Sequence, residues 1–262
     1  MVYNPAIDGE KVLIHAILTA DLTPAQLTAV HERFGLGAML DSPYSRHQLF
    51  ITDKRSWSSL SHLEIWHETP HHDDQPGYFP IIIVDAESPN DNAVWFIDRI
   101  AEQFDIDHKT AESINTLFKV RMDLQDIVCC YVNYDIANTD IREAMDEVGV
   151  PYPTPEDFTQ EKPFSLGFDP VKNRYMCPTW VTAEPDDMEE SRDLKDRSNF
   201  LPLPDVVYRL KEDVARKHGL KARWSIGSDR QDDRFPQGSK ILQLEYDPGH
   251  VTPSYEKPEG SL

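Results

Sequence analysis

The first 150 residues alternate between stretches of strand character and stretches of helical periodicity. KVLIHAILT at 11–19 and HQLFITD at 47–53 have strand character, and the segment 23–35 between them repeats apolar residues on one helical face after a capping Thr23. The uninterrupted apolar run IIIV at 81–84 is typical of a strand that is covered on both faces. This alternation predicts an α/β or α+β fold in which helices pack on a mixed sheet.

Helical periodicity also follows the buried strand. Ser88 and Pro89 are residue types that begin helices, and the apolar spacing after them predicts a helix that extends to residue 104. A further short helix is expected around 110–118 and a strand at FKVRM, 118–122. The face of the first helix that would pack on the sheet consists of Val94, Ile97, Ala101 and Phe104.

The chain changes character after residue 150. Nine prolines lie between 151 and 204, too many for a continuous helix or a central strand. We therefore expect a core domain over 1–150 and a proline-rich, acidic, irregular arm over 151–204. Residues 205–248 should form a helix and a β-hairpin that pack on the core, and 249–262 a tail.

The charge of the chain limits its partners. The formal net charge is −20, and residues 80–160 alone hold seventeen acidic and five basic residues, a net charge of −12. Such a chain is repelled by nucleic acids and by anionic membranes, and its apolar runs fall far short of the roughly 20 residues that span a bilayer. Because the cysteine count is odd, at three, the sequence favours a reducing, cytoplasmic setting.

The stretch HLEIWHETPHHDD at 62–74 gathers four histidines and four carboxylates. His62 and His67 share neither a strand face nor a helix face, so the spacing matches no known metal motif. We expect no metal and no cofactor, and a general acid or base role for the histidines is the more probable chemistry. If a metal were bound, the ligands would come from His67, His71, His72 and Asp73.

Two carboxylates directly follow the buried strand. Asp85 and Glu87 come at its carboxyl end, where sheets of this type border a ligand crevice, although acids there also favour the start of the next helix. The candidate catalytic residues are His62, Glu64, His67, Asp85 and Glu87. The candidate substrate-binding residues are Trp57, Trp66, Tyr131, Asn133 and Tyr134.

Residues 79–150 carry a pattern of their own: a buried strand that ends in Asp, then FKV, then NYDIANTD at 133–140. The pattern resembles a small bacterial domain family of unknown function, and its most specific matches are Asn133, Ile136, Ala137, Asn138 and Asp140. The resemblance implies an α/β module in an intracellular setting and no activity. It also implies that Asn138 and Asp140 brace the start of a helix.

Two functions follow as hypotheses. The first is an intracellular enzyme that acts on a small organic molecule by His and carboxylate acid–base chemistry, as a cyclase, isomerase, dehydratase or hydrolase. The alternative is a non-catalytic inhibitor or immunity-type protein whose acidic face covers a basic protein partner. The sequence does not indicate an oligomeric state.

Overall fold

The computed structural model describes the chain in two compact units. The larger, unit 2, comprises 13–37, 47–168 and 256–262, and the smaller, unit 1, comprises 1–12, 38–46 and 169–255. Both differ in their bounds from the domains expected above, because residues 151–168 belong to the unit with the large sheet. The structure describes all residues except 6–10, 42–45, 71–79, 170–171, 174–177, 229–233 and 251–254.

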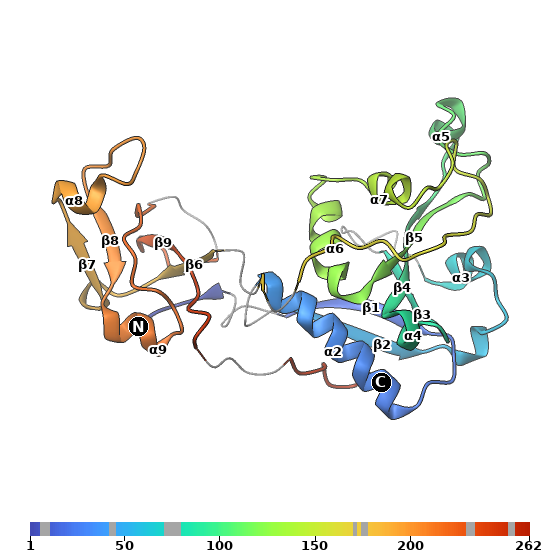
Figure 1. Ribbon diagram of the computed structural model, residues 1–262, viewed down its shortest axis with the longest axis horizontal. Coiled ribbons are helices and arrows are strands. Elements are labelled where there is room, and N and C mark those ends of the chain that lie inside the picture. Colours follow the sequence, from blue (N-terminus) through green and yellow to red (C-terminus); the bar gives the residue numbers. More distant parts are fainter. Residues whose placement is uncertain are drawn as a thin grey trace. The chain divides into compact units, whose positions relative to one another are not determined.

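Unit 2 is built on a mixed five-stranded sheet, which confirms the α/β prediction (Figure 1). The first and third strands pair in parallel, and the third, fourth and fifth are antiparallel neighbours. The strand order across the sheet is β2 (His47–Asp53), β1 (Val12–Leu18), β3 (Ile81–Val84), β4 (Ala93–Ile100) and β5 (Leu117–Asp123).

Helices cover the sheet, and Figure 1 shows α3 on one side of β4 and β5 with α6 and α7 on the other. None of the described helices combines the length and apolar character needed to cross a bilayer. The helices of unit 2 are α2 (Pro24–Asp41), α3 (His62–Glu68), α4 (Ser88–Asp91), α5 (Gln103–Asp107), α6 (Ile127–Asp135) and α7 (Ile141–Glu147), with short 3-10 turns at Arg55–Trp57 and Leu124–Asp126.

The helix predicted from Ser88 to residue 104 is wrong. The chain forms the single turn α4, which ends at Asn92 in the left-handed conformation (φ 57°), and then enters β4. Its run of Val, Trp, Phe and Ile favours a strand, and both faces are buried, so helical and strand spacing look alike in the sequence. Phe104, expected to face the sheet, is 65% exposed.

The helix expected around 110–118 is also wrong. Ala111 instead makes a parallel bridge to Thr154, and β5 has already begun at Leu117. Phe164 makes a second parallel bridge, to Met122, so the segment 154–164 runs along β5. This proline-containing stretch completes the outer edge of the sheet.

The last residues also extend the sheet of unit 2 instead of standing free as a tail. Ile51 of β2 donates its backbone N–H to Ser261 Oγ at 2.9 Å, and Leu262 donates to the Ile51 carbonyl at 3.1 Å. Nε2 of His31 on α2 lies 2.8 Å from the Leu262 carbonyl oxygen. The edge of β2 is thus paired with 261–262.

Unit 1 has its own small core. Its buried residues include Val181, Leu210 and Leu242, and residues 205–219 form a strand followed by a helix in place of one helix. Segments 220–228 and 241–246 lie antiparallel and are joined by two isolated bridges and by ion pairs to Glu245, while the ladder of β9 is formed with β6. The elements are β6 (Thr179–Thr182) paired with β9 (Ile241–Leu244), β7 (Met188–Ser191) paired with β8 (Val207–Leu210), a 3-10 turn at Pro185–Asp187, α8 (Leu194–Arg197) and α9 (Glu212–Lys217).

Gly37 allows α2 to approach the 3-10 turn before α6. A Cβ added at Gly37 would lie 1.7 Å from the backbone oxygen of Gln125, so we expect Gly37→Ala to destabilise the protein by about 3 kcal/mol or more, at the upper end of overpacking costs. Urea unfolding measures this free energy. The exposed Ala29→Ser on the same helix should change it by less than about 0.5 kcal/mol, and an unchanged midpoint for Gly37→Ala would contradict the close approach.

Candidate functional site

Two basic side chains lie on the face of the sheet that α3 covers. Lys119 and Arg121 are two residues apart on β5 and therefore point to the same face. Trp95 of β4 stands opposite Arg121 in the ladder, and His62 of α3 packs edge-to-face on the Trp95 ring at 4.9 Å. Together with Asp85 and Asp91, these four residues form what we call the sheet-face cluster.

Lys119 is the least usual member of the cluster. It is 8% exposed, and its Nζ lies 3.2 Å from Nδ1 of His62. The rings of Trp95 and Phe158 flank the ammonium, with centroids at 5.3 and 5.4 Å. Among the described residues no carboxylate comes within ion-pair distance of it, although Asp157 acts on it over a longer range. A buried lysine in this setting is costly, since desolvation is not offset by an ion pair.

Burial shifts both groups towards their neutral forms, and the charge of Lys119 adds to the shift of His62. Desolvation, followed by the charge of Lys119, lowers the pKa of His62 to about 4. Desolvation also lowers the pKa of Lys119, against the opposing charge of Asp157. His62 is therefore a neutral imidazole at pH 7, and its Nδ1 is a hydrogen-bond acceptor for the Lys119 amine.

Arg121 is held between two carboxylates. It donates to Asp85 from Nη1 at 2.8 Å and Nη2 at 3.1 Å, and to Asp91 from Nε at 2.6 Å and Nη2 at 3.0 Å. Burial works against ionisation of Asp85, but the hydrogen bonds from Arg121 and Ser88 outweigh it and lower the pKa of Asp85. The guanidinium is thereby saturated, so Arg121 has little donor capacity left for a ligand.

The structure brings two of the five candidate catalytic residues together. His62 and Asp85 are half-buried, and the charge of Asp85 acts on the pKa of His62. The other three are exposed. Glu64 completes a capping box with Ser61, Glu87 accepts a hydrogen bond from Asn90, and His67 lies at the far end of α3. The hydrogen bonds of Glu64 and Glu87 therefore brace the starts of helices, and His67 is exposed to solvent.

The two candidate tryptophans pack in an apolar cluster. Trp57 and Trp66 lie against the buried residues Ile65, Ile81 and Ile83, on the face of the sheet that α3 covers. His71, His72 and Asp73 lie outside the described residues. Within the described ranges no group of three His, Cys, Asp or Glu side chains is arranged to hold a metal ion.

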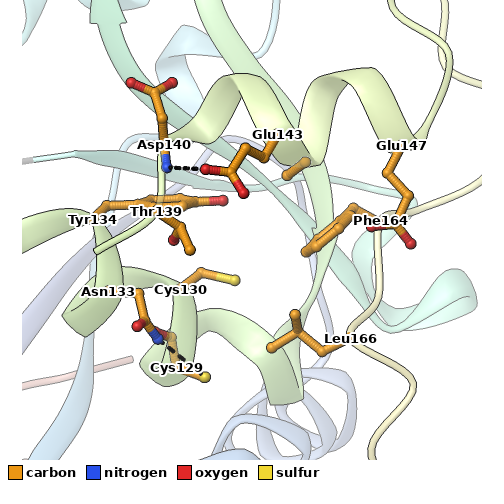
Figure 2. A pocket seen from close by; sticks show the side chains of 11 residues that line it. Cys129, Cys130, Asn133, Tyr134, Thr139, Asp140, Glu143, Glu147, Phe164 and Leu166 are labelled. Carbon is orange, nitrogen blue, oxygen red and sulfur yellow. Dashed lines mark hydrogen bonds between the residues drawn. The ribbon is translucent and has the colours of Figure 1, made fainter. Parts of the chain in front are cut away.

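A pocket of about 200 Å³ lies elsewhere in unit 2, between α6, α7 and the segment 164–166 (Figure 2). Two of the candidate substrate-binding residues, Asn133 and Tyr134, line it. Tyr131, the remaining candidate on α6, contacts the ring of His47 instead, at 6.2 Å between centroids. Figure 2 shows Phe164 and Leu166 on the side opposite Asn133 and Tyr134. The pocket therefore has a polar wall and an apolar wall.

The polar groups of this pocket are committed to each other. Burial raises the pKa of the Cys130 thiol, and burial together with that thiol raises the pKa of Tyr134. Asn133 donates to the Cys129 carbonyl at 2.7 Å and accepts from Asn138 at 2.7 Å. A thiol with a raised pKa is a poor nucleophile. The Cys130 thiol is therefore not an activated nucleophile, and we take the sheet-face cluster as the stronger candidate for chemistry.

The α6–α7 connection has the local geometry that the family resemblance implies. Asp140 is the N-cap of α7, and its carboxylate accepts from the backbone of Arg142 at 2.7 Å. No family model matches the chain, and neither does any curated protein or solved structure. The resemblance of residues 79–150 to a bacterial family therefore stays a prediction.

Sequence reasoning missed the basic half of the cluster. Lys119 and Arg121 stand in FKVRM, which is read as a plain strand, and every residue from Leu117 to Met122 is buried. The available signal is that two basic residues at alternate positions of a fully buried strand must share one buried face. That signal becomes visible only once the strand is known to be covered on both sides.

We expect Asp85→Asn to lower the free energy of unfolding at pH 7 by about 1–3 kcal/mol, because it removes a charged partner of Arg121. The pKa of Asp85 is lowered in the folded protein, so its contribution is present above the unfolded pKa of about 4 and is lost as pH falls through the lower folded value. Denaturant unfolding at pH 7 and pH 3 should show this difference shrinking. The exposed Glu87→Gln is the control, and a difference that grows towards pH 3 would contradict the assignment.

Proposed function

We propose that the protein is an enzyme that acts on a small organic molecule by acid–base chemistry at the sheet-face cluster, with His62 as the general base. The observation that carries the proposal is the contact of His62 Nδ1 with the buried Lys119 amine at 3.2 Å. Neither nucleotide nor metal chemistry is required of the residues involved.

The proposal is supported by the cost, in free energy of folding, of burying Lys119 beside His62. Folding alone would favour apolar residues at both positions, since the surrounding face consists of Ile81, Ile83 and Ile97. A desolvated lysine beside a desolvated histidine lowers the stability of the fold, and such perturbed pairs cluster at functional sites. The cost is understandable if the pair serves proton transfer.

The half-buried position of His62 also supports this role. Its ring packs edge-to-face on the Trp95 ring and its backbone is fixed at the first position of α3, while the residue remains partly exposed. A base must reach the proton that it removes while its orientation stays fixed. The alternative, an acidic protein that covers a basic partner, rests on charge alone and stays a prediction.

Substrate screening tests the proposal. Purified protein is incubated with a metabolite extract, and compounds that disappear are identified by mass spectrometry. We expect His62→Gln to slow turnover of any such compound by roughly 100-fold or more, the usual contribution of a general base. His67→Gln is the matched control, because His67 lies on the same helix and is exposed. Equal turnover by both variants, or none by the wild type across the extract, would overturn the proposal.

The dependence of turnover on pH gives an independent test. Since burial and Lys119 lower the pKa of His62 to about 4, the base is unprotonated at pH 5 and above. We expect the ratio of kcat/KM of the wild type to that of His62→Gln, which cancels the titration of other groups, to stay level from about pH 5 to 7 and to fall as pH drops through about 4. Circular dichroism at each pH verifies that the protein remains folded. A midpoint near 6.5, the ordinary value for histidine, would exclude His62 in this environment as the base.

A further inference from the structure

We propose that Lys119 is a nucleophile that forms a Schiff base with a small neutral aldehyde or ketone, with His62 as the proton acceptor at the attacking nitrogen. This inference rests on the proposed function and names its substrate class. It is carried by the burial of Lys119, by the 3.2 Å contact with Nδ1 of His62, and by the lack of a carboxylate within ion-pair distance in the described chain.

A lysine can attack a carbonyl only as the free amine. Desolvation and a neighbouring cation are the two means by which proteins produce a free amine near neutral pH. Lys119 has the first, because it is 8% exposed and no carboxylate of the described residues lies within ion-pair distance of it. The lowered pKa of Lys119 agrees with this environment. A lysine held by a carboxylate would instead be kept charged.

The position of His62 suits the proton transfers of the reaction. Nζ of Lys119 forms a bond to the carbonyl carbon while the π-electron pair moves to oxygen, and His62 accepts the proton that the nitrogen loses. The imidazolium then gives that proton to the alkoxide, which yields the neutral carbinolamine. A second proton, from solvent, protonates the hydroxyl, and water leaves as the nitrogen lone pair forms the C=N bond. The protonated imine and water thus balance one free amine, one carbonyl compound and one proton taken from solvent.

The surroundings select a neutral substrate. The only other cation identified in the cluster, Arg121, already holds Asp85 and Asp91. A keto acid would therefore bring a carboxylate next to Asp85 and Asp91, whose partner Arg121 is already engaged. Trp95 and Phe158, which flank the amine, offer apolar rings to a carbonyl compound with a short hydrocarbon chain. Propionaldehyde meets these requirements, and pyruvate of similar size does not.

Reductive trapping tests the inference on the full-length protein. Propionaldehyde and cyanoborohydride are added at pH 7, and modified lysines are quantified by peptide mass spectrometry. We expect Lys119 to be labelled at least tenfold faster than Lys221, a matched control whose Nζ is ion-paired to Glu245 at 2.8 Å. Pyruvate at the same concentration should label Lys119 at least tenfold more slowly than propionaldehyde. Labelling of Lys119 no faster than of Lys221 would overturn the inference.

Three variants separate nucleophilicity from mere exposure. His62→Gln should slow labelling of Lys119 about tenfold without changing the labelling of Lys221. If Lys119 were only structural, His62→Gln and the control His67→Gln would change its labelling equally. Lys119→Arg should lose the label and keep the unfolding midpoint within a few degrees. Equal labelling rates at Lys119 in His62→Gln and wild type would overturn the assigned role of His62.

The failures of the two proposals can be told apart. If Lys119 is not labelled selectively but turnover in the metabolite screen still depends on His62, the Schiff base is wrong and acid–base catalysis stands. If Lys119 is labelled selectively but no compound is turned over with dependence on His62, the amine is nucleophilic and the proposed function is wrong.

Discussion

The guanidinium of Arg121 is the interaction on which the candidate site depends. It makes four hydrogen bonds to Asp85, directly after β3, and to Asp91 in α4, and the Arg121 backbone N–H and carbonyl are bonded to the Gln160 side chain at 2.9 and 2.8 Å. One residue thereby connects two strands, one helical turn and the segment along the sheet edge. Because a buried arginine without partners is strongly destabilising, these elements must be in place together.

The ion pairs of Arg121 explain why Lys119 is buried without a carboxylate at ion-pair distance among the described residues. Arg121 takes up the nearby carboxylates Asp85 and Asp91, and so the next basic residue on the same face is left with an imidazole and two aromatic rings. A lysine that lacks a nearby carboxylate and a lysine that lacks water are affected in the same way, because both conditions disfavour the charged ammonium and lower the pKa of the amine. The structural ion pairs and the proposed chemistry of Lys119 are therefore two consequences of one arrangement of charges.

The sequence predicts strands where the pattern has only one interpretation. IIIV at 81–84 and FKVRM at 118–122 are strands in the structure, and the mixed α/β sheet follows from them. β4 was not predicted because Ser88 and Pro89 signal a helix start and the apolar residues after them, such as Val94 and Ile97, also fit helical spacing. Only tertiary pairing with β3 and β5 decides between the two.

The side chains of the candidate site were likewise only partly predictable, because their tertiary surroundings are not visible in the sequence. His62 and Asp85 could be proposed because histidines and post-strand carboxylates are visible as residue types, whereas Lys119 gains its chemistry only from its surroundings. In a chain of net charge −20, a lysine would ordinarily be expected to have its ammonium stabilised. Instead desolvation outweighs the charge of Asp157 and lowers the pKa of Lys119. Local burial, and not the overall charge of the protein, therefore sets the direction in which the pKa of Lys119 is shifted, as expected when water-screened charges act from the surface.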